Sequence, residues 1–519
     1  MAASILRPFL PASGGPGYLR PRWLFLRALG LIFFSAFYAL AFQIHGLIGE
    51  RGILPAGEYL ANVAHALPGL ARFWLAPTLL WLSAGDRALT AVVAAGVVCS
   101  LALVLNVWPR LAVALCTLLF LSCVGALQDF SSYQSDGMLL EAGFISIWFA
   151  PRGLRPGLGA HDPPSPASLW LLRWEWFRIY FESGVVKLAS GDVHWRDLTA
   201  MDEYYQNGPL PAWPGWYVQH FPHWYHAATV IFTFAVELFV VWAVFLPRRF
   251  RLACFAIVTA LQLGIIATAN YAFLNYLVLV LGVLLLDDGV LSRGDGGRGK
   301  GDEVPRDPSL RSGQAIPSGS SSPFPLPPSR FIQALALSWV AYATVAVVFF
   351  RSGPLGAPAR ALEPFRIANQ YGLFAVMTEA RYEIEFQGSR DGGRTWVAYP
   401  FRYKPQDPRQ APHIYAPYQP RFDWNLWFAS LGPWRESQWV VLAQARLLEG
   451  SPSVLRLFGG NPFPDAPPAQ VRTVLWRYWF TDAATKRATG AWWRREELGP
   501  FTGVLSRGAD GRFVLNPAP

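Results

Sequence analysis

The chain is 519 residues long, 53% hydrophobic and only 15% charged, with 23 Trp and 36 Phe residues. A formal net charge of +10 could indicate a nucleic-acid partner, but the arginines lie beside apolar runs and in the C-terminal part rather than in a basic stripe, so we expect no nucleic acid. The cysteines all fall inside apolar runs, which argues against a disulfide framework or a zinc site: Cys99, Cys116, Cys123 and Cys254.

Apolar runs of membrane-spanning length recur from Trp23 to Phe350, so the sequence predicts a polytopic α-helical membrane protein. The first run ends near Leu47 and follows Arg20 and Arg22, which predicts a cytoplasmic N-terminus without a cleavable signal peptide. The chain has no Asn-x-Ser/Thr sequon and is rich in Ala, Arg and Pro. We therefore expect a bacterial inner membrane, or the endoplasmic reticulum membrane for a eukaryotic chain of this kind.

Further runs bring the predicted number of spans to about nine. After a mixed, interfacial segment at 48–87, they are 88–105, 110–127, the apolar part of 128–151, a helix that begins near 170, 227–246, 251–268, 271–286 and 331–350. When these spans alternate, the positive residues Arg110, Arg152 and Arg248 all fall on the cytoplasmic side. The loops 128–137 and 192–226 then fall on the opposite side, together with the C-terminal part.

The composition changes twice more along the chain, which predicts the domain organisation. Residues 287–330 are rich in Gly, Ser and Pro with balanced charge, as in a flexible linker. The predicted parts are a transmembrane domain (1–286), a disordered cytoplasmic linker (287–330), a last transmembrane helix (331–350) and an extracytoplasmic β-rich α+β domain (351–519).

A β-hairpin is the clearest element of the C-terminal domain. Apolar and polar residues alternate in Arg381–Phe386 and again in 397–403, on either side of a turn. The turn fits an Asp-box, in which Asp and Thr side chains cap the hairpin and Trp packs beneath it: Ser389, Asp391, Gly393, Thr395 and Trp396. A single Asp-box is expected to be a folding device, not a sign of glycosidase activity. Helices are predicted at 423–431 and 436–449, and a strand at 471–481.

The segment from 170 to 217 carries ionisable side chains within an apolar run of membrane-spanning length. An ionisable group at membrane depth is costly unless it has a partner or contacts water. At 100° per residue, one face of the helix presents Glu175, Arg178 and Glu182, which predicts that Arg178 bridges the two carboxylates. The other face presents Tyr180, Ser183, Gly184 and Lys187. The predicted polar cluster inside the membrane is Glu175, Arg178, Tyr180, Glu182, Ser183, Lys187 and Glu237.

Lys187 has no carboxylate on its own helix face, so its partner must come from elsewhere. Candidate partners are Glu141, Glu237, Asp136 and Asp192. Two interpretations stay open: structural pairing or snorkelling to the interface, and a lysine acting as a base or lining a ligand site. In the second interpretation Lys187, Glu141 and Glu182 are the candidate catalytic residues.

The loop that follows mixes acidic, basic and aromatic residues and is a candidate surface for a client protein: Asp192, His194, Trp195, Arg196 and Asp197. His220, His223 and His226 recur at intervals of three, but Pro222 interrupts the helix that would align them, so no metal site is expected. No cofactor is expected either. The sequence contains none of the common nucleotide-binding, nucleophile-elbow or metalloprotease motifs, which leaves soluble-enzyme chemistry unsupported.

Several stretches together resemble the lipase maturation factor family. They are SYQSDGMLLEAGFISIWFAP (132–151), FRIYFESGVVKLASGDVHWRDLTAMDEYYQNGPLP (177–211), ANQYGLFAVMT (368–378), the hairpin at 381–405, PYQPRFDWNLWFASL (417–431) and NPFPDAPPAQVR (461–472). The resemblance implies a multi-pass membrane protein that helps exported lipases reach their folded state, with lipase-like clients and membrane lipids as partners. In animals it implies an endoplasmic reticulum location with the C-terminal domain facing the lumen. The family has no established catalytic residues to carry over.

A shorter resemblance concerns the segment from Tyr180 to Lys187, YFESGVVK. It is similar to the Y-x-x-x-G-x-x-K helix in the membrane domain of vitamin K-dependent gamma-carboxylase, where the lysine is the catalytic base. Two functions therefore follow from the sequence. The first is a non-enzymatic maturation factor for exported proteins. The alternative is a membrane-embedded enzyme acting on a lipid or quinone-like molecule, with Lys187 as base.

Overall fold

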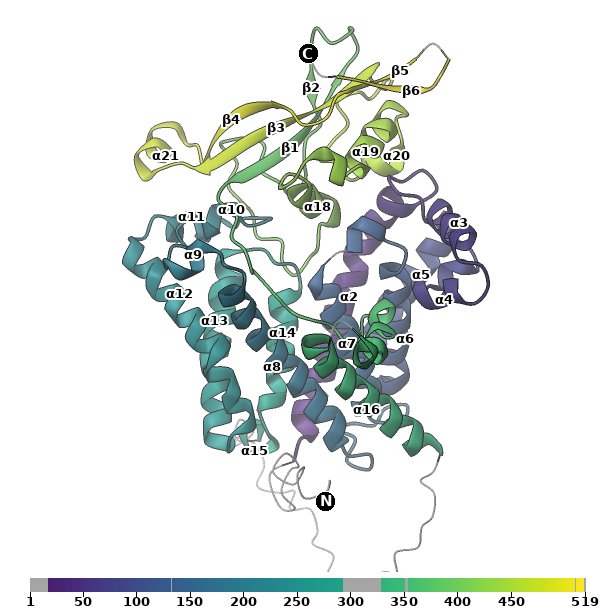
Figure 1. Cartoon of the computed structure of the whole chain (residues 1–519), viewed down its shortest axis with the longest axis vertical. Coiled ribbons are helices and arrows are strands. Elements are labelled where there is room, and N and C mark those ends of the chain that lie inside the picture. The colour runs from purple at the N-terminus through teal and green to yellow at the C-terminus, as the bar shows by residue number, and fades with distance from the viewer. Residues whose placement is uncertain (1–16, 132, 293–327, 351–352, 509, 518–519) are drawn as a thin grey trace, which may run out of the picture.

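The computed structural model describes residues 17–131, 133–292, 328–350, 353–508 and 510–517. Within them, long helices stand side by side and a β-sheet lies across one end of the bundle (Figure 1). This confirms the expected division into a helical membrane part and a sheet-containing C-terminal part. Most of the predicted linker, residues 293–327, lies outside the described residues, as do residues 1–16.

Among the described residues, five helices are long and apolar enough to cross a membrane, by length and composition. They are α2 (Leu19–Ile48), α5 (Asp86–Val104), His223–Phe245, which joins α12 (His223–Leu238) to the 3₁₀ helix η4 (Val240–Phe245), α13 (Arg248–Thr268) and Phe331–Phe349 within α16 (Pro328–Phe349). The other predicted runs are also helical but are shorter or carry charges: α6 (Pro109–Val124), α7 (Gln134–Phe149), α8 (Pro166–Ala189) and α14 (Leu274–Gly282), extended by η5 (Val283–Leu285).

Local sequence explains where several of these helices begin. Pro109 and Pro166 occupy the first turns of α6 and α8, where a missing backbone N–H costs nothing. The side chain of Asp482 caps α21 (Ala483–Thr489) by accepting from Thr485 N–H, and Gly490 ends it with a φ of 74°. Such a left-handed C-cap favours glycine, because other side chains crowd the backbone there.

The remaining helices are short and lie mostly in the connections. They are α3 (Ala56–Ala66), α4 (Ala71–Leu75), α9 (Val193–Arg196), α10 (Tyr204–Asn207), α11 (Trp213–Gln219), α15 (Asp288–Leu291), α17 (Ala357–Arg360), α18 (Arg421–Ala429), α19 (Trp439–Leu448) and α20 (Pro452–Leu455). Short 3₁₀ helices complete the set: η2 (Leu79–Trp81), η3 (Gln128–Ser131), η8 (Pro354–Gly356), η9 (Glu363–Phe365) and η10 (Trp434–Glu436).

The sheet is antiparallel throughout and is built around β3 (Gln470–Phe480). β1 (Arg381–Ser389) pairs with β3 along its whole length, and the strand order is β2-β1-β3-β5-β6 with β4 also on β3. The other strands are β2 (Val397–Ala398), β4 (Trp493–Pro500), β5 (Val504–Arg507) and β6 (Phe513–Asn516). β1 and β2 form the predicted hairpin, although β2 is only two residues long, and α18 and α19 pack against the sheet (Figure 1).

Buried arginines join the sheet-containing part to the helical part. Arg421 of α18 donates to both carboxylate oxygens of Asp136 on α7, at 2.7 and 2.8 Å, and neither side chain is exposed to solvent. Arg381 of β1 is equally buried and donates to the carbonyl of Gln206 in α10 and to that of Pro209 in the loop that follows. A buried guanidinium group is stable only where most of its donors meet acceptors, so these contacts fix how the two parts sit together.

Candidate functional site

Buried charged side chains meet where α7 and α8 pack together. Arg178 of α8 forms an ion pair with Glu141 of α7 and lies 3.9 Å from the carboxylate of Glu182. The sequence-based prediction that Arg178 bridges Glu175 and Glu182 is therefore wrong for Glu175, which is buried without an ion pair among the described residues. Spacing along one helix shows which side chains share a face, but it cannot show which residue a neighbouring helix presents.

The segment 366–378, which we call the strap, runs from the membrane helices up to β1 and contains no regular helix or strand. Irregular backbone in a buried place needs partners for its N–H and C=O groups. The strap finds them on α8 and on the loop after it. Leu373 N–H donates to Ser183 Oγ at 3.2 Å, and Met377 N–H donates to Asp192 Oδ2 at 2.6 Å.

The charged cluster on α7 and α8 supplies the other partners of the strap. Glu141 Oε2 accepts from the backbone N–H and the side chain of Asn369 and from the hydroxyl of Tyr371, at 2.9 to 3.1 Å. Glu182 Oε2 accepts from Tyr371 N–H at 2.7 Å, and Arg178 donates to the Asn369 carbonyl at 2.6 Å. Glu141, Arg178 and Glu182 therefore anchor the strap, which gives these buried charges a structural role.

Lys187 has its partner on α12. Its Nζ lies 2.8 Å from both carboxylate oxygens of Glu237, and it also reaches the Ser183 carbonyl at 3.4 Å. The Lys187 side chain is 2% exposed and that of Glu237 is 11% exposed. The other candidate partners are engaged elsewhere. Glu141 pairs with Arg178, and Asp136 pairs with Arg421. Asp192 accepts a hydrogen bond from the strap. Lys187 therefore sits in a neutral, buried pair.

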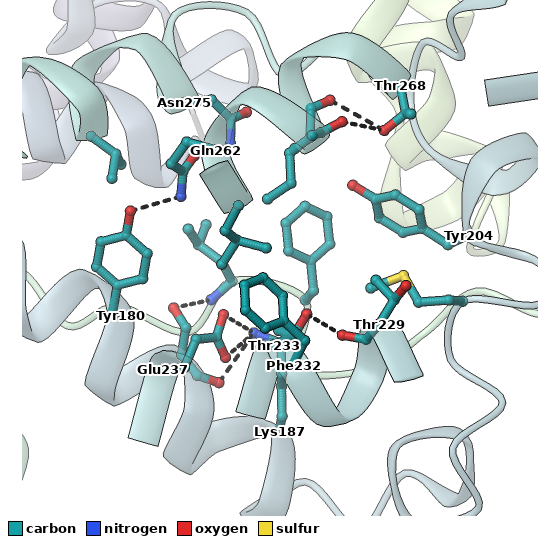
Figure 2. A pocket seen from close by; sticks show the side chains of 18 of the residues that line it. Tyr180, Lys187, Tyr204, Thr229, Phe232, Thr233, Glu237, Gln262, Thr268 and Asn275 are labelled. Carbon is teal, nitrogen blue, oxygen red and sulfur yellow. Dashed lines mark hydrogen bonds and ion pairs between the residues drawn. The ribbon is translucent and has the colours of Figure 1, made fainter. Parts of the chain in front are cut away.

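A cavity of about 330 Å³ lies beside this pair, bounded by α8, α12, α13, α14 and the strap (Figure 2). Most of its lining is apolar or aromatic. One polar chain crosses it: Asn275 donates to Gln262 at 2.7 Å, and Gln262 donates to the Tyr180 hydroxyl at 2.8 Å. The structure thus brings together Tyr180, Ser183, Lys187 and Glu237 of the predicted polar cluster, because all four line this cavity.

Two cavity residues, Gln262 of α13 and Asn275 of α14, are not among those predicted from the sequence. Both are buried amides inside otherwise apolar helices. A polar amide at such a position needs a hydrogen-bond partner, so its presence in an apolar run was the signal that could have found it.

The loop after α8 was predicted to face a client, and this is wrong for Trp195, which is buried. Trp195 is 2% exposed; its indole N–H donates to the Phe374 carbonyl, and its ring lies 5.2 Å from Lys187 Nζ. Asp192 caps α9 and binds the strap. His194 is half-buried beside Thr199, whereas Arg196 and Asp197 are exposed. The loop therefore buries the Trp195 ring, and its charged residues Arg196 and Asp197 stay accessible to a partner.

The three regularly spaced histidines do not converge. His220 Nδ1 lies 2.6 Å from the Trp216 carbonyl, and His223 Nδ1 lies 3.0 Å from Asp202. His226 is buried beside the ring of Tyr205. In the described part of the chain, no three His, Cys, Asp or Glu side chains are grouped as a metal ion would require.

The Asp-box turn links β1 to β2 through a dense set of hydrogen bonds. Asp391 accepts from the N–H groups of Arg394 and Thr395, both at 3.0 Å, and from the Thr395 hydroxyl at 2.6 Å. These bonds, led by that of the Thr395 hydroxyl, lower the pKa of Asp391. Ser389 Oγ accepts from Gly393 N–H, and Arg472 stacks on Trp396 at 4.4 Å. Every one of these contacts stays within the domain.

Two family models match the chain in order. Residues 20–293 match the lipase maturation factor transmembrane domain, and residues 367–503 match the lipase maturation factor C-terminal domain. No solved structure matches the chain.

Full-length relatives agree with these matches. The chain is 32% identical to lipase maturation factor 1 of Bos taurus over 505 residues, which cover 94% of this chain and 89% of the relative. It is 31% identical to lipase maturation factor 2 of Gallus gallus, over 94% of this chain and 82% of the relative. Both domains match together and at nearly full length, so the chain belongs to the lipase maturation factor family.

Proposed function

We propose that this chain is a multi-pass membrane factor that brings exported lipases to their folded state outside the cytoplasm. The observation that carries the proposal is the similarity to lipase maturation factors across both domains and 94% of the chain. The architecture supports it, because the strap and the buried arginines hold the C-terminal domain firmly on the membrane helices. A folding factor of this kind would present a fixed surface to a client near the membrane.

The surface that we assign to the client lies around α11 and the start of α12, in the predicted 192–226 loop. It carries large apolar side chains that are 46 to 69% exposed: Trp213, Tyr217, Phe221 and Trp224. Next to them, Lys486 of α21 lies 3.1 Å from the centre of the Trp492 ring and 4.0 Å from that of Trp216. The loop and the C-terminal domain therefore form one aromatic surface, which suits the apolar segments that an unfinished client exposes.

We further propose nine spans, with the N-terminus and the 287–330 linker in the cytoplasm and residues 351–519 outside it. In the described part of the chain, the five helices of spanning length and the shorter α6, α7, α8 and α14 coincide with the predicted runs, which supports this number. The arginine-rich start of α13 lies at the end of the bundle opposite the sheet (Figure 1). Arg248 and Arg251 pair there with Asp287 at 2.7 and 3.3 Å. Positive charge concentrated at that end fits a cytoplasmic face.

The alternative function, a membrane-embedded enzyme with Lys187 as base, gains no support from the relatives. Both oxygens of Glu237 hold Lys187 Nζ, so this lysine is already engaged in a close ion pair. The cavity beside it is better explained as a binding site than as a reaction centre.

Site-specific photocrosslinking in cells that co-express an exported lipase tests the proposed function. A photoreactive phenylalanine replaces Tyr217 or Trp224 on the aromatic surface, or Phe250 at the opposite end of the bundle as the matched control. All three side chains are exposed, at 48%, 69% and 43%.

The lipase should be recovered from the first two positions and not from Phe250, and its exported activity should fall when the chain is removed. Loss of lipase activity without any crosslink at either position would reject the proposed surface. Unchanged lipase activity and no crosslink would reject the function itself.

A further inference from the structure

The cavity beside Lys187 opens sideways, between α12 and α13. Among its lining residues, Phe232 of α12 is 42% exposed, and Ala260, Gly264 and Ala267 of α13 are exposed as well. Both helices belong to the set long and apolar enough to cross a membrane. The mouth of the cavity therefore faces the hydrocarbon of the bilayer, not water.

Small residues keep this mouth open. Ala260, Gly264 and Ala267 follow the i, i+4, i+7 spacing that places side chains on one face of a helix. A Cβ atom added to Gly264 would meet no heavy atom within 4 Å. The backbone of α13 thus borders open space at this point, where a larger side chain would project into the entrance.

The polar groups in the cavity are already engaged with one another. Lys187 and Glu237 neutralise each other, and Tyr180, Gln262 and Asn275 form one hydrogen-bonded chain. The threonines bond to their own helices: Thr233 Oγ1 donates to the Thr229 carbonyl, and Thr229 Oγ1 donates to the Tyr225 carbonyl, both at 2.9 Å. No net charge remains to attract an ionic ligand, so the cavity favours an uncharged, apolar occupant.

We propose that this cavity binds a hydrocarbon chain of a bilayer lipid, which enters between α12 and α13 and packs against Phe232 and Ile265. Its volume of about 330 Å³ falls at the lower end of small-ligand sites. Because the walls are apolar and the mouth opens to lipid, a hydrocarbon chain gains van der Waals contacts that water could not replace. The occupant would also touch Leu373 and Phe374 of the strap, which line the cavity.

Photolabelling of the full-length chain in phosphatidylcholine vesicles tests this site. One arm contains phosphatidylcholine with a diazirine in one acyl chain, and the other contains a free fatty acid with the same group. Labelled peptides are mapped by mass spectrometry. We expect label on Phe232 and Ile265, and the arm that delivers it identifies the source of the hydrocarbon chain.

Gly264→Phe should block the mouth, and labelling of the cavity should fall about tenfold, since excluding even two methylene groups weakens binding by that factor. Ala267→Phe provides a second block on the same face. The matched control is Ala256→Phe, an exposed small residue of α13 outside the cavity, which should leave cavity labelling unchanged. Thermal stability in detergent verifies that each variant folds.

Label confined to the outer faces of α12 and α13 would mean surface lipid only and would overturn the proposal. Cavity labelling that persists in both folded blocking variants would overturn it equally. Neither labelling experiment requires a lipase client. A negative result for lipid binding can therefore be told apart from a negative result for the proposed function.

Discussion

At the scale of single residues, the chain holds charge inside the membrane by pairing it across helices. Lys187 on α8 and Glu237 on α12 are separated by 50 positions, yet their charged atoms lie 2.8 Å apart. Removing one member of a buried pair leaves an uncompensated charge and costs about 3–5 kcal/mol, whereas replacing both with apolar residues is often neutral. The pair therefore makes a prediction that separates a structural role from a chemical one.

Lys187→Met should lower the thermal stability of the purified chain strongly, because Glu237 would be left alone beside an apolar cavity. The loss should approach the 3–5 kcal/mol typical of a broken buried pair. Lys187→Met combined with Glu237→Leu should restore most of the stability, and with it the export of active lipase. If the double variant folds but lipase maturation stays abolished, Lys187 has a role beyond pairing.

A second residue links stability to pH in the C-terminal domain. Burial raises the pKa of Asp423 from 3.8 to about 7, against the opposing charge of Lys404. The folded chain thus binds this proton more tightly than the unfolded chain. Its stabilising effect is complete below the ordinary pKa of a carboxyl group and is lost as pH rises from about 4 to about 7.

We predict that Asp423→Asn removes this dependence. The wild-type chain should lose stability as the pH rises from about 4 to about 7, by at most about 4 kcal/mol, while the variant should show a flatter profile. Thermal unfolding followed at several pH values measures the difference. Parallel profiles for the two chains would mean that Asp423 does not titrate in this range.

At the scale of elements, the strap explains why α7 and α8 carry charges at all. An irregular segment lacks the regular backbone hydrogen bonds of a helix or strand, so its buried N–H and C=O groups need partners, most of them in the helices it crosses. Glu141, Arg178, Glu182 and Ser183 provide these partners. The polar face of the helix is thus the binding site for another part of the same chain.

Asn369→Ala tests this view of the strap. Its side chain donates to the Gly137 and Arg366 carbonyls and to Glu141, at 2.9 to 3.0 Å. Its removal should cost about 1–3 kcal/mol and speed proteolytic cleavage near residues 366–378. The exposed neighbour Gln370, changed to Ala, is the control and should leave cleavage unchanged. Equal cleavage rates in the two variants would contradict an anchored strap.

At the scale of the whole molecule, the sheet and the arginine-rich helix ends lie at opposite ends of the bundle (Figure 1). This arrangement predicts the outcome of labelling with a membrane-impermeant maleimide, in a background without the native cysteines. Cysteine at Arg494 on the exposed side of β4 should react in intact cells. Cysteine at Arg249, at the start of α13, should react only after the membrane is opened. Reaction of Arg249→Cys in intact cells would contradict the proposed orientation.

The sequence by itself determined the elements and the family. Apolar runs, prolines and alternating strands depend on neighbours in the chain, so α2, α13, the β1–β2 hairpin and the charged face of α8 were all visible in it. Family membership also followed, because matching stretches recur in order along the chain.

Only the tertiary structure decided which buried groups meet. Glu141 with Arg178, Glu237 with Lys187 and Asp136 with Arg421 join positions that are 37, 50 and 285 residues apart. The tertiary structure also decided that Trp195 is buried, and that residues of α8, α12, α13 and α14 line one cavity. The physical reason is that a buried charge takes its partner from whichever helix packs against it, and the packing of helices is a property of the whole chain.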